Sequence, residues 1–556
     1  MMDRKQTSNN FEHKKLLLIV PHQDDEINVM GSLSEELLQK GYEVFVVYTT
    51  NGDYEFKAET RIKEGLNALK SLGISSNHVF ILGYGDMLNN TCHPHIFSAI
   101  EPTVSPSGHS ETYGISTKLD YVFMLHNKHH AYTRNNYLKD LKEIILQIEP
   151  DLLFVVDYDE HSDHRMTSLS FDRVMGEILH RKNNAYFPVV YKGFAYSTAY
   201  KAIDDFYNVN LLETRENKKI SDLINCSIYQ WSERVRFPVA KSQTGRFLCN
   251  KNLFKALCCH KSQNVGLNAK RIINSDKVFW ERRTDSLGYK AVVIASSNQI
   301  DAHYVNDFML YNTNDIDSHE PGLENYYWKP DVTDPDKSIT FIWHKKQNIQ
   351  LIRLFSQINT GGCIKKAKVT FDDGYEVEVG PFNESGAPVV ISLEKIHSVS
   401  YCNIKILEAF GNKDYGWAEC EFFESPTPGE LQPFIKILIN ENFVYNYWVA
   451  RDVLVIPLFV YSFHIDDKVI YSIVEDCYSE IVDNQLLIDK RDQRITIRAT
   501  AVGYPSISDT ITIYRKSSYQ LLVLKVAQRI ENFILSAWLR CHRKFYHLRK
   551  KYVNDI

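Results

Sequence analysis

The sequence has little of what marks a disulfide scaffold, a zinc ribbon or a membrane-spanning protein. Its 556 residues include 10 cysteines, and no two of them have CxxC spacing, so the cysteines show neither a metal-binding pattern nor the density of a disulfide scaffold. No apolar run reaches the roughly 20 residues that a membrane-spanning helix needs. The polar N-terminal stretch and the short apolar run at 16–20 do not form a signal-peptide core. We therefore expect a cytoplasmic protein whose cysteines are reduced and mostly buried.

An excess of charge of one sign is also missing. The 64 Lys and Arg residues nearly balance the 69 Asp and Glu residues, and the formal net charge is −5. This balance excludes a general binder of polyanions, so we expect no nucleic-acid partner. At about 150 residues per domain, the length predicts three or four domains. A hydrophobic fraction of 44% and a charged fraction of 24% are those of an ordinary globular protein.

What the chain does contain is a dense polar cluster directly after an apolar run. Residues 16–20 read LLLIV and predict a short buried strand, and residues 21–26 read PHQDDE. In an α/β sheet, ligands bind outside the carboxyl ends of the strands. A solvated acidic turn before a helix is the alternative interpretation, because acids favour the first turn of a helix.

A second cluster of the same kind follows another apolar run. Residues 152–156 read LLFVV and residues 157–165 read DYDEHSDHR. Zinc binds histidine nitrogen and carboxylate oxygen, and a catalytic zinc site keeps one position open. Two such loops at one edge of a sheet supply three protein ligands and a free carboxylate. The pair of clusters therefore favours a metal site over an acidic turn.

The pattern His-x-Asp-Asp-Glu followed later by His-x-Asp-His resembles the LmbE-like family of zinc-dependent de-N-acetylases. That family includes the N-acetylglucosaminyl-phosphatidylinositol de-N-acetylases (PIG-L). The resemblance covers roughly the first 290 residues and extends to TTNGD at 49–53, LGYGD at 82–86, ALCCHKSQ at 256–263 and FWER at 279–282. It implies a Rossmann-like α/β domain with a parallel sheet, a Zn²⁺ cofactor, and an N-acetylated sugar of the GlcNAc type as substrate.

The same resemblance implies roles for individual residues. The implied metal ligands are His22, Asp25 and His164. Asp24 is the candidate general base, which takes a proton from the attacking water and delivers it to the amide nitrogen. His161 is expected to stabilise the developing oxyanion as an imidazolium. Asp163 either orients a histidine behind the metal or caps the following helix.

Substrate contacts are expected at the mouths of these loops. Arg61 and Asp86 match positions that contact sugar hydroxyls in relatives, and an Arg fork with an Asp acceptor suits vicinal hydroxyls. The alternative for Arg61 is a structural ion pair with Glu64 or Asp53.

A long irregular insertion at 89–131, with a turn at 106–108, is a further source of contacts, because loops of this length are usually functional. His109 in this insertion could reach the substrate, whereas His93 and His95 are expected to be merely solvated. Two weaker candidates for substrate contact are His260 and Gln263.

These residues leave some alternatives open. A His₂Asp ligand set does not select zinc strongly, so Fe²⁺ or another divalent metal is a possible occupant. A zinc amidase acting on a non-sugar N-acyl compound, and a non-catalytic carbohydrate-binding or scaffold protein, are the alternative functions.

The hydrophobic pattern divides the chain into four parts. Residues 1–290 alternate strands and helices, which predicts βαβ units. The expected strands are 16–20, 43–49, 79–82 and 152–156, and the expected helices are 27–40, 57–71 and 136–148. Residues 291–425 carry short alternating runs of an antiparallel β-sandwich, with Trp343, FDDG at 371–374 and GWAE at 416–419. These motifs resemble the galactose-binding, discoidin-type sandwich, which either binds sugar or acts as a spacer. Residues 426–517 suit a small immunoglobulin-like sandwich.

The last part, residues 518–556, predicts a basic amphipathic helix. Between Arg540 and Lys551 there are six Lys or Arg residues and no acid. Such a helix is typical of a peripheral anchor on an anionic membrane surface, here the inner face. Docking on the chain's own domains, or pairing with another copy, is the alternative. The apolar stripe comprises Val523, Val526, Ile530, Phe533, Ile534, Trp538, Cys541, Phe545, Leu548 and Tyr552.

Overall fold

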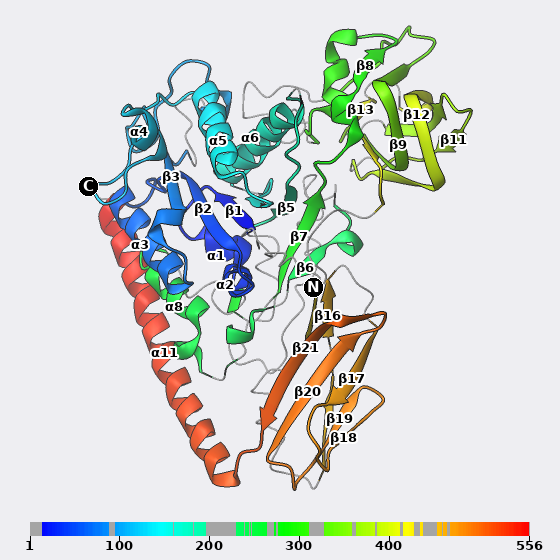
Figure 1. The fold of residues 1–556 in the computed structure, drawn as a ribbon. Coiled ribbons are helices and arrows are strands. Elements are labelled where there is room, and N and C mark those ends of the chain that lie inside the picture. The colour runs from blue at the N-terminus through cyan, green and yellow to red at the C-terminus, as the bar shows by residue number, and fades with distance from the viewer. Residues whose placement is uncertain are drawn as a thin grey trace, which may run out of the picture.

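The computed structural model describes most of residues 14–554. The segments outside the description are 1–13, 88–94, 160, 182, 196–228, 238, 244, 246, 264–271, 274–275, 311–326, 359–362, 384–385, 412–414, 427–433, 438–452, 459, 464–467 and 555–556. The described residues form a mostly parallel α/β domain, then antiparallel β domains, and finally a long C-terminal helix (Figure 1). The expected order of folds is therefore confirmed.

The first domain is built on a seven-stranded sheet in the order β3-β2-β1-β4-β5-β7-β6. Neighbouring strands pair in parallel from β3 through β2, β1 and β4 to β5. Strand β7 pairs antiparallel with both β5 and β6. Their bounds are β1 Lys15–Val20, β2 Glu43–Thr50, β3 Val79–Tyr84, β4 Leu152–Val156, β5 Val189–Gly193, β6 Val235–Phe237 and β7 Lys277–Arg282. The apolar runs at 16–20 and 152–156 are fully buried, as parallel strands covered on both faces require.

Helices cover this sheet, and their packing divides the apolar side chains into two large clusters, one on each face. The helices of this domain are α1 Asp25–Met30, α2 Leu33–Gln39, α3 Ala58–Ser71, α4 Tyr121–His126, α5 Arg134–Ile148, α6 Ser162–Leu179 and α8 Asn252–Cys259. The single helix expected at 27–40 is wrong, because the chain breaks at Gly31, where φ is 52°. A Cβ at Gly31 would lie 2.4 Å from Cε of Lys277, so that side chain would have to move, and the positive φ would strain any other residue. Sequence periodicity also missed α4, which lies inside the long insertion.

The order of the strands decides where a site can form. The chain runs from β1 outward to β3 on one side, and returns to β4 on the other side of β1. Such a reversal opens a crevice at the carboxyl ends of the two central strands. The loops that carry PHQDDE and DYDEHSDHR both leave the sheet at this crevice.

The second domain is an antiparallel sheet in the order β11-β10-β12-β9-β13, to which β8 is added by pairing with β9. Its strands are β8 Val292–Ala295, β9 Ser338–Ser356, β10 Cys363–Phe371, β11 Glu376–Val379, β12 Val389–Phe410 and β13 Trp417–Phe423. The short runs at 338–343 and 349–354, expected as separate strands, are joined in β9, and those at 389–393 and 404–407 are joined in β12. Register shifts between these two strands absorb their irregular middle sections.

The third domain has its own small apolar core. Three antiparallel sheets of two or three strands enclose it. The strands are β14 Phe434–Ile437, β15 Val453–Pro457, β16 Val460–Phe463, β17 Val469–Ile473, β18 Glu480–Val482, β19 Gln485–Asp489, β20 Arg494–Ala501 and β21 Tyr504–Tyr514.

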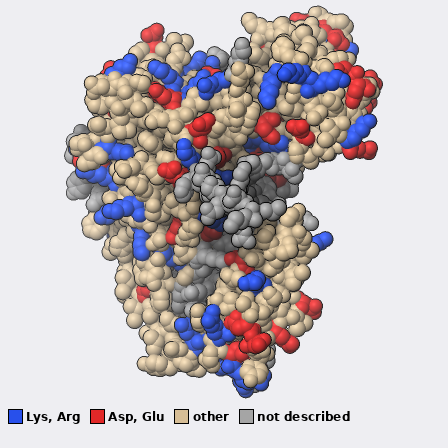
Figure 2. Space-filling model, viewed as in Figure 1, with Lys and Arg blue, Asp and Glu red and all other residues tan. Residues whose placement is uncertain are grey.

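On the face of the molecule seen in Figure 2, basic and acidic residues are intermixed, as the balanced composition implies.

The C-terminal helix α11 (Ser518–Asn554) confirms the helix expected at the end of the chain. It runs back from the third domain along the α/β domain, beside α3 and α8 (Figure 1). Leu535 and Leu539 pack against the apolar cluster between those helices. No helix among the described residues is long and apolar enough to span a bilayer.

The cysteines follow the expectation only in part. The eight cysteines that the structure describes are free thiols. Three of these are buried and the others are partly or fully exposed, so the expectation that most are buried is wrong.

Candidate functional site

The loop after β1 is folded tightly around its own carboxylates. Pro21 ends the strand, and Asp25 starts α1 four residues later. The backbone N–H of His22 donates to Oδ2 of Asp25 at 3.1 Å. Asp24, between them, has φ 151°, a conformation that non-glycine residues rarely adopt. The loop therefore holds the carboxylates of Asp24 and Asp25 in different directions, at the cost of backbone strain.

Asp25 joins the two loops. Its Oδ2 lies 3.0 Å from Nδ1 of His22 and 3.1 Å from Nε2 of His164, which comes from α6 after β4. The centroids of these two imidazole rings are 5.4 Å apart. All three side chains are buried. The two loops therefore converge at the crevice, as the metal-site interpretation requires.

Asp159 is a site residue that sequence reasoning missed. Both of its carboxylate oxygens contact Nδ1 of His164, at 2.7 and 2.8 Å, and Oδ2 also accepts from the backbone N–H of Ala195. A carboxylate on Nδ1 fixes the ring and leaves Nε2 directed at Asp25. The available signal was the position of Asp159 in the same loop, five residues before His164.

Asp163 lies behind His22. Its Oδ2 contacts Nε2 of His22 at 3.1 Å, and its Oδ1 contacts Nε2 of His95 at 2.9 Å. Asp163 therefore orients histidines, in keeping with the first of the two roles considered for it. The alternative is wrong, because the capping side chain of α6 is His161, whose Nδ1 accepts from the backbone N–H of Asp163.

The expectation that His95 is solvated is wrong. Only 9% of its side chain is exposed, and it forms an ion-pair contact with Asp163. A histidine from the long insertion therefore reaches the buried cluster. No periodic pattern marks this insertion, so nothing in the sequence showed where the imidazole would lie. His93 lies outside the described residues.

The electrostatics of the cluster favour positive charge at its centre. Burial alone would lower the pKa of both His22 and His164, but the surrounding carboxylates outweigh it. The pKa of His22 is raised well above its usual range by Asp86, Asp163 and Asp25. The pKa of His164 is raised to about 10 by Asp159 and Asp25. A buried field that stabilises imidazolium equally suits a bound divalent cation.

The donor set fits a divalent metal. Two groups of three residues have potential ligand atoms within 4.8 Å of one another, namely His22, His161 and His164, and His22, Asp86 and Asp163. Asp25 contacts two of these imidazoles, and its buried Oδ1 has no hydrogen-bond partner among the described residues. Nitrogen and carboxylate ligands about 2 Å from zinc are roughly 3.3 Å apart in a tetrahedron, close to the separations around Asp25. The more specific ligand set of His22, Asp25 and His164 stays a prediction.

Asp24 is paired with a buried arginine. Nη2 of Arg61 donates to Oδ1 of Asp24 at 2.9 Å. Burial raises the pKa of Asp24, and Arg61 acts in the opposite direction. Both alternatives that the sequence left for a structural ion pair are wrong, because Glu64 instead accepts from Ser262 and Asp53 accepts from Tyr113. Nη1 of Arg61 has no hydrogen-bond partner among the described residues.

His161 lies beside the two other imidazoles. Its ring centroid is 4.5 Å from that of His22 and 4.8 Å from that of His164. Burial, with the two neighbouring imidazoles, lowers the pKa of His161 well below its usual value. This environment favours the neutral ring.

The remaining candidates lie around this centre at different depths. Asp86 is buried, and its Oδ2 lies 3.6 Å from Nε2 of His22. His260 is also buried, with Nε2 2.7 Å from Oε1 of Glu26. Gln263 donates to Ser262. His109 is exposed and stacks on the ring of Tyr113, at a centroid distance of 4.0 Å, so it lies on the surface of the insertion.

Comparison with known proteins places this site in a family. Residues 17–175 match the family model of the GlcNAc-PI de-N-acetylases, PIG-L. The N-terminal domain is a PIG-L/LmbE-like deacetylase domain. Residues 287–423 match the model of a domain of unknown function, DUF7402. No curated protein matches the chain. The matched PIG-L region contains both strand-end loops, so the deacetylase assignment and the buried His/Asp cluster belong to the same part of the chain.

Solved structures similar to the PIG-L domain include two deacetylases. The N,N'-diacetylchitobiose deacetylase of Pyrococcus horikoshii is 22% identical, with a TM-score of 0.20, over 32% of this chain and 60% of that one. The chain thus spans about 60% of the length of that relative. A deacetylase of teicoplanin biosynthesis is 14% identical, with a TM-score of 0.28, over 49% of this chain and 99% of that one.

The second domain is similar to carbohydrate-binding modules. A family 32 module of Clostridium perfringens, solved in complex with galactose, is 17% identical, with a TM-score of 0.18, over 24% of this chain and 90% of that one.

The contact of His95 with Asp163 generates a prediction for metal binding. His95→Ala should weaken the affinity of the metal-free protein for Zn²⁺ roughly 10- to 100-fold, because Asp163 would lose one of the two imidazoles that orient it. Isothermal titration with Zn²⁺ measures this affinity. His109→Ala, a surface histidine of the same insertion, is the matched control and should leave the affinity unchanged. Equal affinities for the two variants would show that His95 has no part in the site.

Proposed function

We propose that the PIG-L domain hydrolyses the N-acetyl group of an N-acetylated amino sugar of the GlcNAc type, in a glycan or glycolipid precursor, and releases acetate. The observation that carries the proposal is the buried cluster of histidines and aspartates at the reversal between β1 and β4, inside the region that matches the deacetylase family. The cluster has acids that favour a cation and, beside it, a separate carboxylate for proton transfer.

The metal-binding part of this proposal rests on chain residues only. His22, Asp25 and His164 would hold a divalent cation, Zn²⁺ or Fe²⁺, which supplies Lewis acidity toward the amide carbonyl and the attacking water. Asp159 and Asp163 hold the imidazoles of His164 and His22 in place by contacts of 2.7 and 3.1 Å. The ligands are thus pre-oriented, so little rearrangement accompanies binding.

Asp24 is the proposed general base. Water adds its hydroxyl to the carbonyl carbon while Asp24 takes the proton, and the same carboxyl then gives that proton to nitrogen as the C–N bond breaks. Arg61 holds one carboxylate oxygen of Asp24 at 2.9 Å and leaves the other available. The carboxylate of Asp24 contacts Arg61, whereas that of Asp25 contacts His22 and His164. The proposed base, Asp24, and the proposed metal ligand, Asp25, therefore have separate partners although they are adjacent in the sequence.

His161 is proposed to stabilise the oxyanion as a neutral hydrogen-bond donor. Its Nδ1 accepts from the backbone N–H of Asp163 at 3.2 Å, so the neutral ring carries its proton on Nε2. A fixed N–H directed at the developing charge contributes a few kcal/mol, about 2.7–4 in well-studied oxyanion holes. This tautomer replaces the imidazolium expected from the sequence.

Arg61 and Asp86 are the proposed contacts to sugar hydroxyls. Both are buried beside the cluster. Nη2 of Arg61 donates to Asp24, whereas Nη1 donates to none of the described residues. A bound hydroxyl would satisfy it, which favours a polyhydroxylated substrate over an apolar N-acyl compound.

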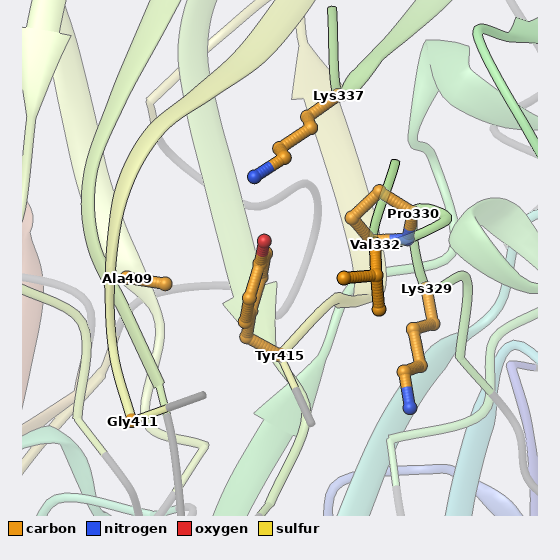
Figure 3. A pocket seen from close by; sticks show the side chains of 7 residues that line it. All are labelled: Lys329, Pro330, Val332, Lys337, Ala409, Gly411 and Tyr415. Carbon is orange, nitrogen blue, oxygen red and sulfur yellow. The ribbon is translucent and has the colours of Figure 1, made fainter. Parts of the chain in front are cut away.

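The second domain offers a pocket for a further sugar contact. The cavity has a volume of ≈ 270 Å³, and its lining includes Lys337 and Tyr415. The ring of Tyr415 stands between Ala409 and Gly411 on one side and Pro330 and Val332 on the other (Figure 3). Nζ of Lys337 lies 5.7 Å from the ring centroid. An aromatic face beside a polar donor suits a pyranose ring, so we propose that this pocket holds a glycan rather than serving only as part of a spacer.

A binding assay tests the role of this pocket. Tyr415→Ala should abolish or weaken at least tenfold the binding of the full chain to a GlcNAc- or galactose-containing oligosaccharide, measured by isothermal titration. Tyr401→Ala changes an exposed tyrosine elsewhere in the same domain and should have no effect. Unchanged binding by the Tyr415 variant would contradict a glycan site in this pocket and would favour a spacer role for the domain.

Acetate release tests the deacetylase proposal. The metal-loaded protein should release acetate from free, nucleotide-linked or lipid-linked N-acetylhexosamines, and a chelator should abolish this activity. Asp24→Asn should lower kcat about 10²- to 10⁴-fold, because the amide accepts no proton, with metal content unchanged. Glu59→Gln, an exposed acid on α3, is the control.

Three outcomes would contradict parts of this account. Full activity of the Asp24 variant would remove Asp24 as the base. Release of acetate from N-acetyl amino acids but not from N-acetyl sugars would identify an amidase of another substrate class. No release from any compound, by protein that holds one metal ion, would favour a non-catalytic binding protein.

A further inference from the structure

The C-terminal helix α11 has two apolar faces, and among the described residues one of them packs on the rest of the molecule. The inner face packs on the α/β domain through Leu535 and Leu539, beside a cluster that contains Ile27, Leu253 and Phe254. Glu531 on the same face accepts hydrogen bonds from the backbone N–H groups of Leu248 and Cys249, at 3.2 and 2.9 Å. These contacts attach the helix to its own domain.

The other apolar face of α11 points away from the protein. The exposed fractions are 54% for Ile530, 72% for Phe533, 57% for Ile534 and 62% for Phe545. At 3.6 residues per turn these side chains lie on one side of the helix, roughly opposite Leu535 and Leu539. Tyr519, Leu522, Val523 and Val526 extend the same exposed stripe toward the start of the helix. This outer stripe is long and continuous, which scattered surface residues are not.

Positive charge accompanies the outer stripe. The exposed basic residues of the helix are Lys525, Arg529, Arg540, Arg543 and Lys544. Glu531 is the only acid between residues 518 and 554, and it is turned inward to the backbone of Leu248 and Cys249. At 3.6 residues per turn, Arg529, Arg540 and Lys544 border the outer stripe, whereas Lys525 and Arg543 lie nearer the inner side. The outer surface of α11 thus combines large apolar side chains with basic side chains and no acid among its described residues.

We propose that the outer stripe of α11 docks the protein on an anionic lipid surface. Exposed apolar side chains insert at the boundary of headgroups and acyl chains, while Lys and Arg beside them contact anionic headgroups. A second copy of the chain fits less well, because pairing two outer stripes would bring basic side chains of both copies together without acids to neutralise them. This inference does not depend on the proposed deacetylase activity.

The inner face gives the docked state a fixed geometry. Because Leu535, Leu539 and Glu531 already hold α11 along α3 and α8 (Figure 1), the helix need not leave its domain in order to bind lipid. The α/β domain would lie directly on the bilayer surface, not at the end of a free tail. An enzyme held in this way meets substrates that are anchored in the membrane.

Vesicle co-sedimentation of the full chain tests the proposal. The protein should sediment with vesicles of phosphatidylcholine and phosphatidylglycerol, and added salt should weaken this binding. The double variant Ile530→Ser/Phe533→Ser should weaken it tenfold or more, since each buried large side chain contributes about that factor or more. Ile300→Ser/Ile396→Ser, two residues exposed by 84% and 54% in the second domain, is the matched control and should bind as the unchanged protein does.

A second variant separates charge from apolar contact. Arg540→Glu/Lys544→Glu should abolish the preference for phosphatidylglycerol over pure phosphatidylcholine, whereas Lys345→Glu/Lys346→Glu on the second domain should keep it. Equal sedimentation of the Ile530/Phe533 variant and the unchanged protein would overturn the proposal. So would a dimer in sedimentation velocity that the Ile530/Phe533 variant converts to monomer, because the stripe would then be covered by a second copy.

Discussion

The adjacency of β1 and β4 at the centre of the sheet is the constraint on which the site depends. The chain leaves β1 in one direction and later returns to its other side, so the loops after both strands meet in one crevice. Asp25 links them through contacts of 3.0 and 3.1 Å to His22 and His164. Without this order of strands, the two polar clusters would be unrelated surface loops.

Charge compensation accounts for the depth of the site. Burying Asp25, Asp159 and Asp163 in a protein interior is costly unless cations or donors face them. Here His22, His95 and His164 provide those partners, and a divalent cation would complete the balance. The same reasoning explains Arg61, whose buried guanidinium is neutralised by Asp24. The general base and the cluster of ligands therefore rest on separate charge pairs.

Sequence patterns predicted the features that depend on local periodicity and motif spacing. The central strands, the order of domains and the convergence of His22, Asp25 and His164 belong to this class. Features set by contacts between distant segments were not predictable. His95 reaches Asp163 from an insertion without periodicity, Arg61 on α3 pairs with Asp24 in the loop after β1, and the side chain of Lys277 lies against Gly31, where the expected helix breaks. Likewise, the apolar stripe on α11 was visible in the sequence, but the packing of the opposite face on the α/β domain, through Leu535 and Leu539, was not.

The central claim is that one divalent cation is held jointly by the loops after β1 and β4. Anomalous diffraction at the zinc absorption edge, from crystals of the zinc-loaded protein, tests it most directly. The account predicts a single strong peak about 2.0–2.2 Å from a nitrogen of His22, an oxygen of Asp25 and a nitrogen of His164. A peak bound by the residues of one loop only, or no peak at this crevice, would contradict it.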